Sequence, residues 1–106
     1  MAVKGKFVIS QVDDVFYFEL RANNGQQLYE SRPYSSEKYC RAAVDNFVKH
    51  ITSQPVLDVR RDKTGHYRWF YVSGPTYYMG IAYTTFTSAK ENAESVRKFA
   101  LISKIE

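Results

Sequence analysis

The sequence predicts an α+β protein made of two tandem β-β-β-α repeats, with antiparallel sheets and the helices packed on one face. Several short runs alternate apolar and polar residues with a period of two, which is typical of half-buried strands. Two other runs carry apolar residues at helical spacing. This whole pattern recurs after about 51 or 52 residues, and an internal repeat decides the architecture.

The repeat aligns both strand and helix residues. Tyr34-Ser35-Ser36 aligns with Phe86-Thr87-Ser88, with a one-residue change of offset expected near the turns at 23–25 and 73–76. We therefore expect one domain over residues 1–106, with repeat one at 5–51 and repeat two at 56–103. The aligned pairs are Phe16 with Tyr67, Phe18 with Trp69, Leu20 with Tyr71, Val44 with Val96 and Phe47 with Phe99.

Three strands and a helix are expected in repeat one. Strands at 6–12, 15–22 and 26–31 are separated by Asp13-Asp14 and by Asn23-Asn24-Gly25, which is a strong hairpin signal. Ser35 or Ser36 then caps a helix. The second strand presents Phe16, Phe18, Leu20 and Ala22 inward, and the apolar stripe of the helix is Cys40, Val44, Phe47, Val48 and Ile51.

Repeat two follows the short polar connection 52–55, which is too brief for independent domains. Strands are expected at 56–61, 66–73 and 77–84, with turns at 62–65 and 73–76. Ser88-Ala89-Lys90-Glu91 has the form of a capping box, which predicts a helix that begins there.

These residues carry a family resemblance. Gly5-Lys6-Phe7, the aromatic second strand, Asn-Gly and Tyr34-Ser35-Ser36 in repeat one, with residues 62–69, 87–92 and 95–98 in repeat two, resemble the YegP-like family of bacterial domains of unknown function 1508, in its tandem-repeat form. The resemblance implies tandem β-β-β-α units, single-unit relatives that pair as homodimers, and no established activity. Ala93 stands where the family usually has glycine in the second helix, and the first helix diverges through Tyr39-Cys40-Arg41.

No catalytic, metal or cofactor motif emerges from the sequence. Cys40 would need a base, and His50 lies about 15 Å farther along the same helix. Two distant histidines and one cysteine do not have the spacing of a tetrahedral metal site. Asp13-Asp14 and Asp62 fall in turns, where aspartate bonds the local backbone. We therefore expect no cofactor and no enzymatic activity.

Composition bears on the cellular location of the protein and on the charge of its partners. A single cysteine cannot form an intrachain disulfide, which favours a cytoplasmic location. No secretory signal or run of 18 apolar residues is present, so we expect no membrane association. The net charge of +4 is a modest basic excess that favours polyanions without requiring them.

One candidate binding surface follows from the strand alternation. If the aligned aromatic residues point inward, the opposite face carries arginine beside aromatic rings, with Arg60 or Arg61 nearby. The first hypothesis is a protein-binding module and the second is weak, sequence-tolerant nucleic-acid binding, because stacking and charge recognise single strands. A monomer is preferred to a homodimer, because a tandem can satisfy the pairing within one chain. The candidate face is Tyr17, Arg21, Arg60, Arg68 and Phe70.

Overall fold

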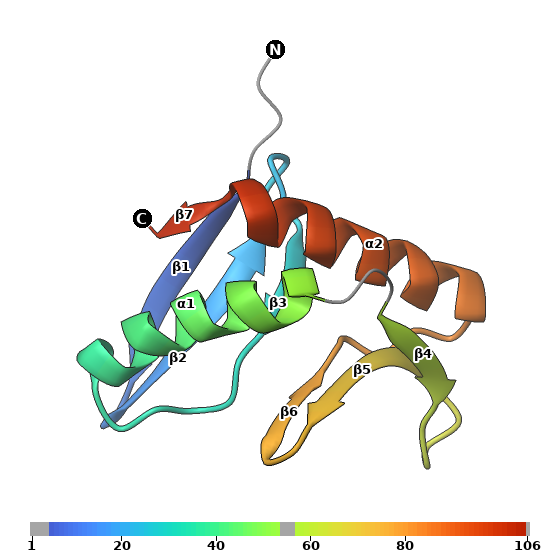
Figure 1. Ribbon diagram of the computed structural model, residues 1–106, viewed down its shortest axis with the longest axis horizontal. Helices are drawn as coiled ribbons and strands as arrows, with labels where there is room; N and C mark the ends of the chain where they lie inside the picture. The colour runs from blue at the N-terminus through green and yellow to red at the C-terminus, as the bar shows by residue number, and fades with distance from the viewer. Residues whose placement is uncertain (1–4, 54–56, 106) are drawn as a thin grey trace.

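A computed structural model describes residues 5–53 and 57–105 (Figure 1). The described chain contains two sheets and two helices, and the second half repeats the β-β-β-α order of the first. The elements are β1 (Lys6–Val12), β2 (Val15–Arg21), β3 (Gln27–Glu30), α1 (Glu37–Ser53), β4 (Asp58–Arg61), β5 (Tyr67–Ser73), β6 (Thr76–Met79), α2 (Phe86–Ile102) and β7 (Lys104–Ile105).

Each half forms an antiparallel meander, which confirms the predicted fold class. Sheet one has the order β3-β2-β1-β7 and sheet two the order β4-β5-β6. The short strand β7 was not predicted. It pairs in parallel with β1 and returns the C-terminal end of the described chain to sheet one. Its two residues are too few to give a periodic signal.

The strand predictions are largely confirmed, and the differences lie at their ends. β3 is shorter than predicted, and β5 begins at Tyr67 rather than His66. β6 ends at Met79 instead of continuing to residue 84, and only an isolated bridge between Tyr67 and Tyr83 extends the pairing. Val56, the predicted start of β4, lies outside the described residues, as does part of the connection before it.

The two helices begin with the same cap, which corrects the sequence alignment. The Ser36 hydroxyl accepts from the backbone N–H of Tyr39, and the Thr85 hydroxyl accepts from that of Ser88. The second cap is therefore Thr85, and the predicted capping box at Ser88 is wrong. A shift of three residues keeps an apolar helical stripe nearly in register, so periodicity could not expose the error.

Equivalent positions are accordingly 51 residues apart in β2 and β5 but 49 apart from the third strands onward. Two matching bridges fix this offset, Phe16 with Tyr34 and Tyr67 with Tyr83. The two-residue change occurs because the loop between β2 and β3 is longer than the tight turn between β5 and β6. The buried helix stripes then superpose as Cys40 with Ala89, Val44 with Ala93, Phe47 with Val96 and Ile51 with Ala100.

The two halves share one aromatic core. Phe18, Leu20, Trp69 and Tyr71 are buried, as the alternation predicted, whereas Phe16 is only half-buried. Rings from the two sheets meet α1, and the Phe47 ring centroid lies 4.4 Å from that of Tyr29. Figure 1 shows α1 across β1 and β2 and α2 extending from the side of β7 to sheet two. Each half buries aromatic surface against the other, which stabilises both.

A buried asparagine on α2 joins the two halves by hydrogen bonds. The Trp69 indole N–H donates to Asn92 Oδ1 at 3.0 Å, and Asn92 Nδ2 donates to the Leu28 carbonyl at 3.1 Å. Asn92 is only 5% exposed, so both bonds satisfy groups that water cannot reach. This contact sets α2 against β5 of its own half and β3 of the other.

Candidate functional site

The structure distributes the candidate face over both sheets. Tyr17 and Arg21 lie on β2, whereas Arg60 lies on β4 and Arg68 and Phe70 lie on β5. Buried or partly buried residues such as Phe18, Leu20 and Trp69 alternate with them along the strands, and Arg60 lies opposite Arg68, so all five side chains belong to the outer faces. The sequence indicated their direction but could not show that they belong to two separate sheets.

Each of the three arginines already has a carboxylate partner. Arg21 pairs with Glu19 at 2.7 Å, and Arg60 pairs with Asp58 at 2.6 Å. Arg68 pairs with Asp62 at 2.9 Å, and its side chain is only 19% exposed. These pairs compensate much of the charge that a phosphate backbone would need.

Asp62 organises the turn between β4 and β5. It accepts hydrogen bonds from the Thr64 hydroxyl and from the backbone N–H groups of Thr64 and His66. The Thr64 hydroxyl bond is the main cause that lowers the pKa of Asp62 to about 2, with smaller contributions from the two backbone bonds and Arg68. Asp62 therefore builds the turn, as predicted, and Arg68 is a structural partner of that turn.

The outer face of sheet two carries an apolar patch that the sequence reasoning missed. We define the apolar patch as Phe70, Val72, Tyr77 and Met79. Phe70 lies opposite Met79 and Val72 opposite Tyr77 on adjacent strands, so the four side chains form a contiguous block. Val72 is 67% exposed, Tyr77 53% and Met79 42%. The available signal was the alternation of Tyr77 and Met79 with the inward Tyr78.

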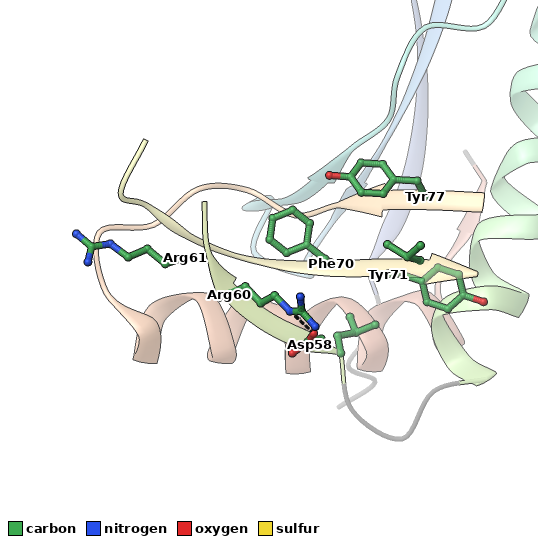
Figure 2. A pocket seen from close by; sticks show the side chains of 8 residues that line it. Asp58, Arg60, Arg61, Phe70, Tyr71 and Tyr77 are labelled. Atoms are coloured by element: carbon green, nitrogen blue, oxygen red, sulfur yellow. Dashed lines mark hydrogen bonds and ion pairs between the residues drawn. The ribbon is translucent and has the colours of Figure 1, made fainter. Parts of the chain in front are cut away.

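A shallow cleft of about 570 Å³ borders this patch. Figure 2 shows Phe70 and Tyr77 on the side of the strands away from α2, with the ion pair of Arg60 and Asp58 beside them. The Phe70 and Tyr77 ring centroids are 6.3 Å apart. An apolar centre with a charged rim is the arrangement found at protein interfaces. The cleft is lined by Leu57, Asp58, Arg60, Arg61, Phe70, Tyr71, Val72 and Tyr77.

The residues considered for catalysis have structural surroundings. Cys40 is fully buried on the apolar face of α1, and burial raises the pKa of its thiol. His50 Nδ1 lies 3.0 Å from the Tyr78 hydroxyl, and His66 Nδ1 lies 2.8 Å from that of Thr64. Within residues 5–53 and 57–105, no group of three His, Cys, Asp or Glu side chains could hold a metal ion. Neither described helix is long and apolar enough to span a membrane.

The fold and surfaces define a small tandem β-β-β-α protein, and comparisons show which family it resembles. Residues 12–58 match the family described as "Domain of unknown function (DUF1508)", so the resemblance to the YegP-like family is confirmed. A search of curated proteins found no match.

Two solved structures share the fold over nearly their whole length. The protein of unknown function yegP from E. coli has 18% identity and a TM-score of 0.78, with coverage of 100% of this chain and 94% of its own. A UPF0339 protein from Shewanella oneidensis has 14% identity and a TM-score of 0.74, with coverage of 97% and 90%. At these identities the likeness establishes the fold and leaves function to the surfaces of this chain.

Proposed function

We propose that this protein is a non-enzymatic interaction module that binds a partner protein through the apolar patch on sheet two. The observation that carries the proposal is the block of half-buried Phe70 with exposed Val72, Tyr77 and Met79 on adjacent strands. Contiguous exposed apolar surface rimmed by polar residues marks interaction sites on small proteins. The single buried cysteine fits a reducing compartment, so a cytoplasmic location stays a prediction. The monomeric state also stays a prediction.

A matched pair of valine variants tests the patch. Val72→Lys places a charge inside the patch, whereas Val12→Lys places the same charge at another exposed position, at the end of β1. Both should leave the free energy of unfolding within about 0.5 kcal/mol of wild type. In affinity capture from cell lysate followed by mass spectrometry, we expect Val72→Lys to lose specific polypeptides about tenfold, as at an interface hot spot.

Val12→Lys should retain those polypeptides. Equal recovery with Val72→Lys and wild type would contradict binding through the patch. Loss with both variants would show a general effect of charge instead.

Nucleic-acid binding through Tyr17, Arg21, Arg60, Arg68 and Phe70 remains the second prediction. Fluorescence titration of Trp69 and the tyrosines with single-stranded DNA and RNA at two salt concentrations distinguishes the two functions, because phosphate contacts weaken steeply with salt. Arg60→Ala is the suitable variant, because its pair with Asp58 is exposed, whereas Arg68→Ala would remove the partner of Asp62, which organises the turn between β4 and β5. A salt-sensitive signal that Arg60→Ala weakens would favour nucleic acid.

A further inference from the structure

A groove of about 620 Å³ lies between the two halves of the molecule. One wall is β6 with the preceding Pro75, and the other wall is the segment 29–32 with Tyr34. Ala43, Asn46 and His50 of α1 contribute to the same groove. Its volume falls within the range of about 300 to 1,000 Å³ that is common for ligand pockets.

The wall formed by β6 is a free strand edge. Sheet two has the order β4-β5-β6, so among the residues that the structure describes β6 has a neighbour on one side only. The backbone N–H of Gly80 donates to the Trp69 carbonyl. In an antiparallel pair, every second residue points its backbone N–H and C=O toward the neighbouring strand. The backbone groups of Tyr77 and Met79 therefore point away from β5. Over the described part of the chain, no hydrogen bond reaches those groups. Two amides and two carbonyls are therefore available on that edge.

The other half satisfies one backbone group on the equivalent edge, which belongs to β3. Tyr71 of β5 is equivalent to Leu20 of β2, and these two residues lie opposite Tyr78 and Tyr29. Tyr78 is therefore equivalent to Tyr29, and the preceding residue of β6, Tyr77, is equivalent to Leu28 of β3. The Leu28 carbonyl accepts from Asn92 of α2. With the helix offset of 49 residues, the position equivalent to Asn92 is Ala43, which has no polar side chain and lines the groove. The groove thus lies at the place where the equivalent of the Asn92 side-chain donor is absent.

The groove is lined by one carboxylate, Glu30, and one guanidinium, Arg32. Glu30 accepts a hydrogen bond from Gln27, so Arg32 is the charged group that an anionic ligand would pair with. Arg32 is exposed, its guanidinium lies 5.9 Å from the centre of the Tyr34 ring, and no carboxylate among the described residues pairs with it. A carboxylate near Arg32 and an apolar side chain against Tyr34 would satisfy both features.

We propose that this groove binds an extended acidic peptide segment of a partner protein, which adds to β6 as a fourth strand of sheet two and places a carboxylate on Arg32. Strand addition supplies the missing partners for the Tyr77 and Met79 backbone groups. The four residues of β6 set the paired length at about 14 Å, which is four extended residues. This site goes beyond the apolar patch, because its recognition elements are a backbone edge and a cation.

A displayed library of random heptapeptides, selected on immobilised full-length protein, tests the proposal. We expect enriched peptides to share an Asp or Glu at a fixed position. Arg32→Gln should weaken their affinity about tenfold in fluorescence anisotropy, because a charged hydrogen-bonded partner is lost. Arg41→Gln, which changes an exposed arginine of α1 outside the groove, is the matched control and should retain wild-type affinity.

The backbone contribution is tested at Met79. Met79→Pro removes an amide that faces the groove without removing a bond to β5, so it should also weaken binding about tenfold. Met79→Ala removes the same side chain but keeps the amide, so Met79→Pro should bind more weakly than Met79→Ala. If circular dichroism shows that Met79→Pro is unfolded, hydrogen exchange of the wild-type Tyr77 and Met79 amides replaces it, with protection expected on peptide binding.

Several results would overturn the proposal. These are no enrichment, wild-type affinity in Arg32→Gln or in folded Met79→Pro, or unprotected Tyr77 and Met79 amides. Loss of peptide binding in Val72→Lys would assign the peptides to the apolar patch instead. A wild-type dimer in sedimentation that Met79→Pro dissociates would make a second copy of the chain the occupant.

Discussion

The two halves have the same strands and helix but solve the same packing problem differently. Trp69 on β5 corresponds to Phe18 on β2, and Asn92 on α2 corresponds to Ala43 on α1. An indole brings an N–H into the core, and Asn92 accepts it while donating to the other half. A phenyl ring needs no such partner. One pair of substitutions therefore satisfies both a core N–H and a carbonyl on the β3 edge, while the equivalent carbonyl of Tyr77 on β6 has no such donor among the described residues.

The outer faces differ as clearly as the interiors. On sheet one, Glu19 accepts from Arg21 and from Gln27, and Gln27 also donates to Glu30, so the part of the face formed by β2 and β3 carries a polar network. On sheet two, the corresponding surface is the apolar patch. Because the fold requires only the inward residues to be apolar, the outer face of sheet two is free of that constraint. The proposed protein binding would account for its apolar character.

The largest effect is expected from breaking the bridge between the halves. Asn92→Ala leaves both the Trp69 N–H and the Leu28 carbonyl buried without partners. Each such group costs about 1 to 3 kcal/mol, so we expect the free energy of unfolding to fall by about 3 kcal/mol. Thermal unfolding should show the melting temperature reduced by roughly 15 °C.

Asn46→Ala is the matched control, since it removes the same amide from an exposed position on α1. It should stay within about 0.5 kcal/mol of wild type. A loss for Asn92→Ala no larger than that of the control would show that the bridge contributes little to stability.

The sequence predicted the layers of this fold because the inward residues follow a strict period of two. Phe18, Leu20, Trp69 and Tyr71 all face the core as expected. Helix starts were harder, because apolar residues at intervals of three and four permit a shift of one turn. Such a shift misassigned the cap from Thr85 to Ser88.

The binding surfaces were only partly predictable. The arginines of the candidate face were identified, but their pairing with nearby carboxylates depends on side-chain geometry. The groove depends on residues from β3, α1 and β6, which are far apart in sequence and meet only in the folded chain. The link from Asn92 to Leu28 has the same origin.

A smaller, pH-dependent effect is expected at the turn of sheet two. Because the pKa of Asp62 is lowered from 3.8 to about 2, its ionised form stabilises the fold above about pH 4, and this contribution is lost as the pH falls towards 2. Asp62→Asn should lower the melting temperature at pH 7 and bring the variant closer to wild type at pH 2. Asp14→Asn, in the turn of sheet one, is the control. Parallel melting curves for Asp62→Asn and wild type across this range would contradict the assignment.

The smallest effect is expected from making the halves alike. Ala43→Asn places an amide at the position equivalent to Asn92, where it can donate to the Tyr77 carbonyl as Asn92 donates to Leu28. A new hydrogen bond of this kind contributes about 0.5 to 1.5 kcal/mol, so denaturant unfolding should show stabilisation of that size. The same variant should bind the selected peptides less tightly, because the amide competes for the β6 edge. Ala43→Ser, whose shorter side chain has less reach, separates this effect from a general change on α1. Unchanged stability together with unchanged peptide affinity in Ala43→Asn would show that the Tyr77 carbonyl on β6 is not the counterpart of the Leu28 carbonyl on β3.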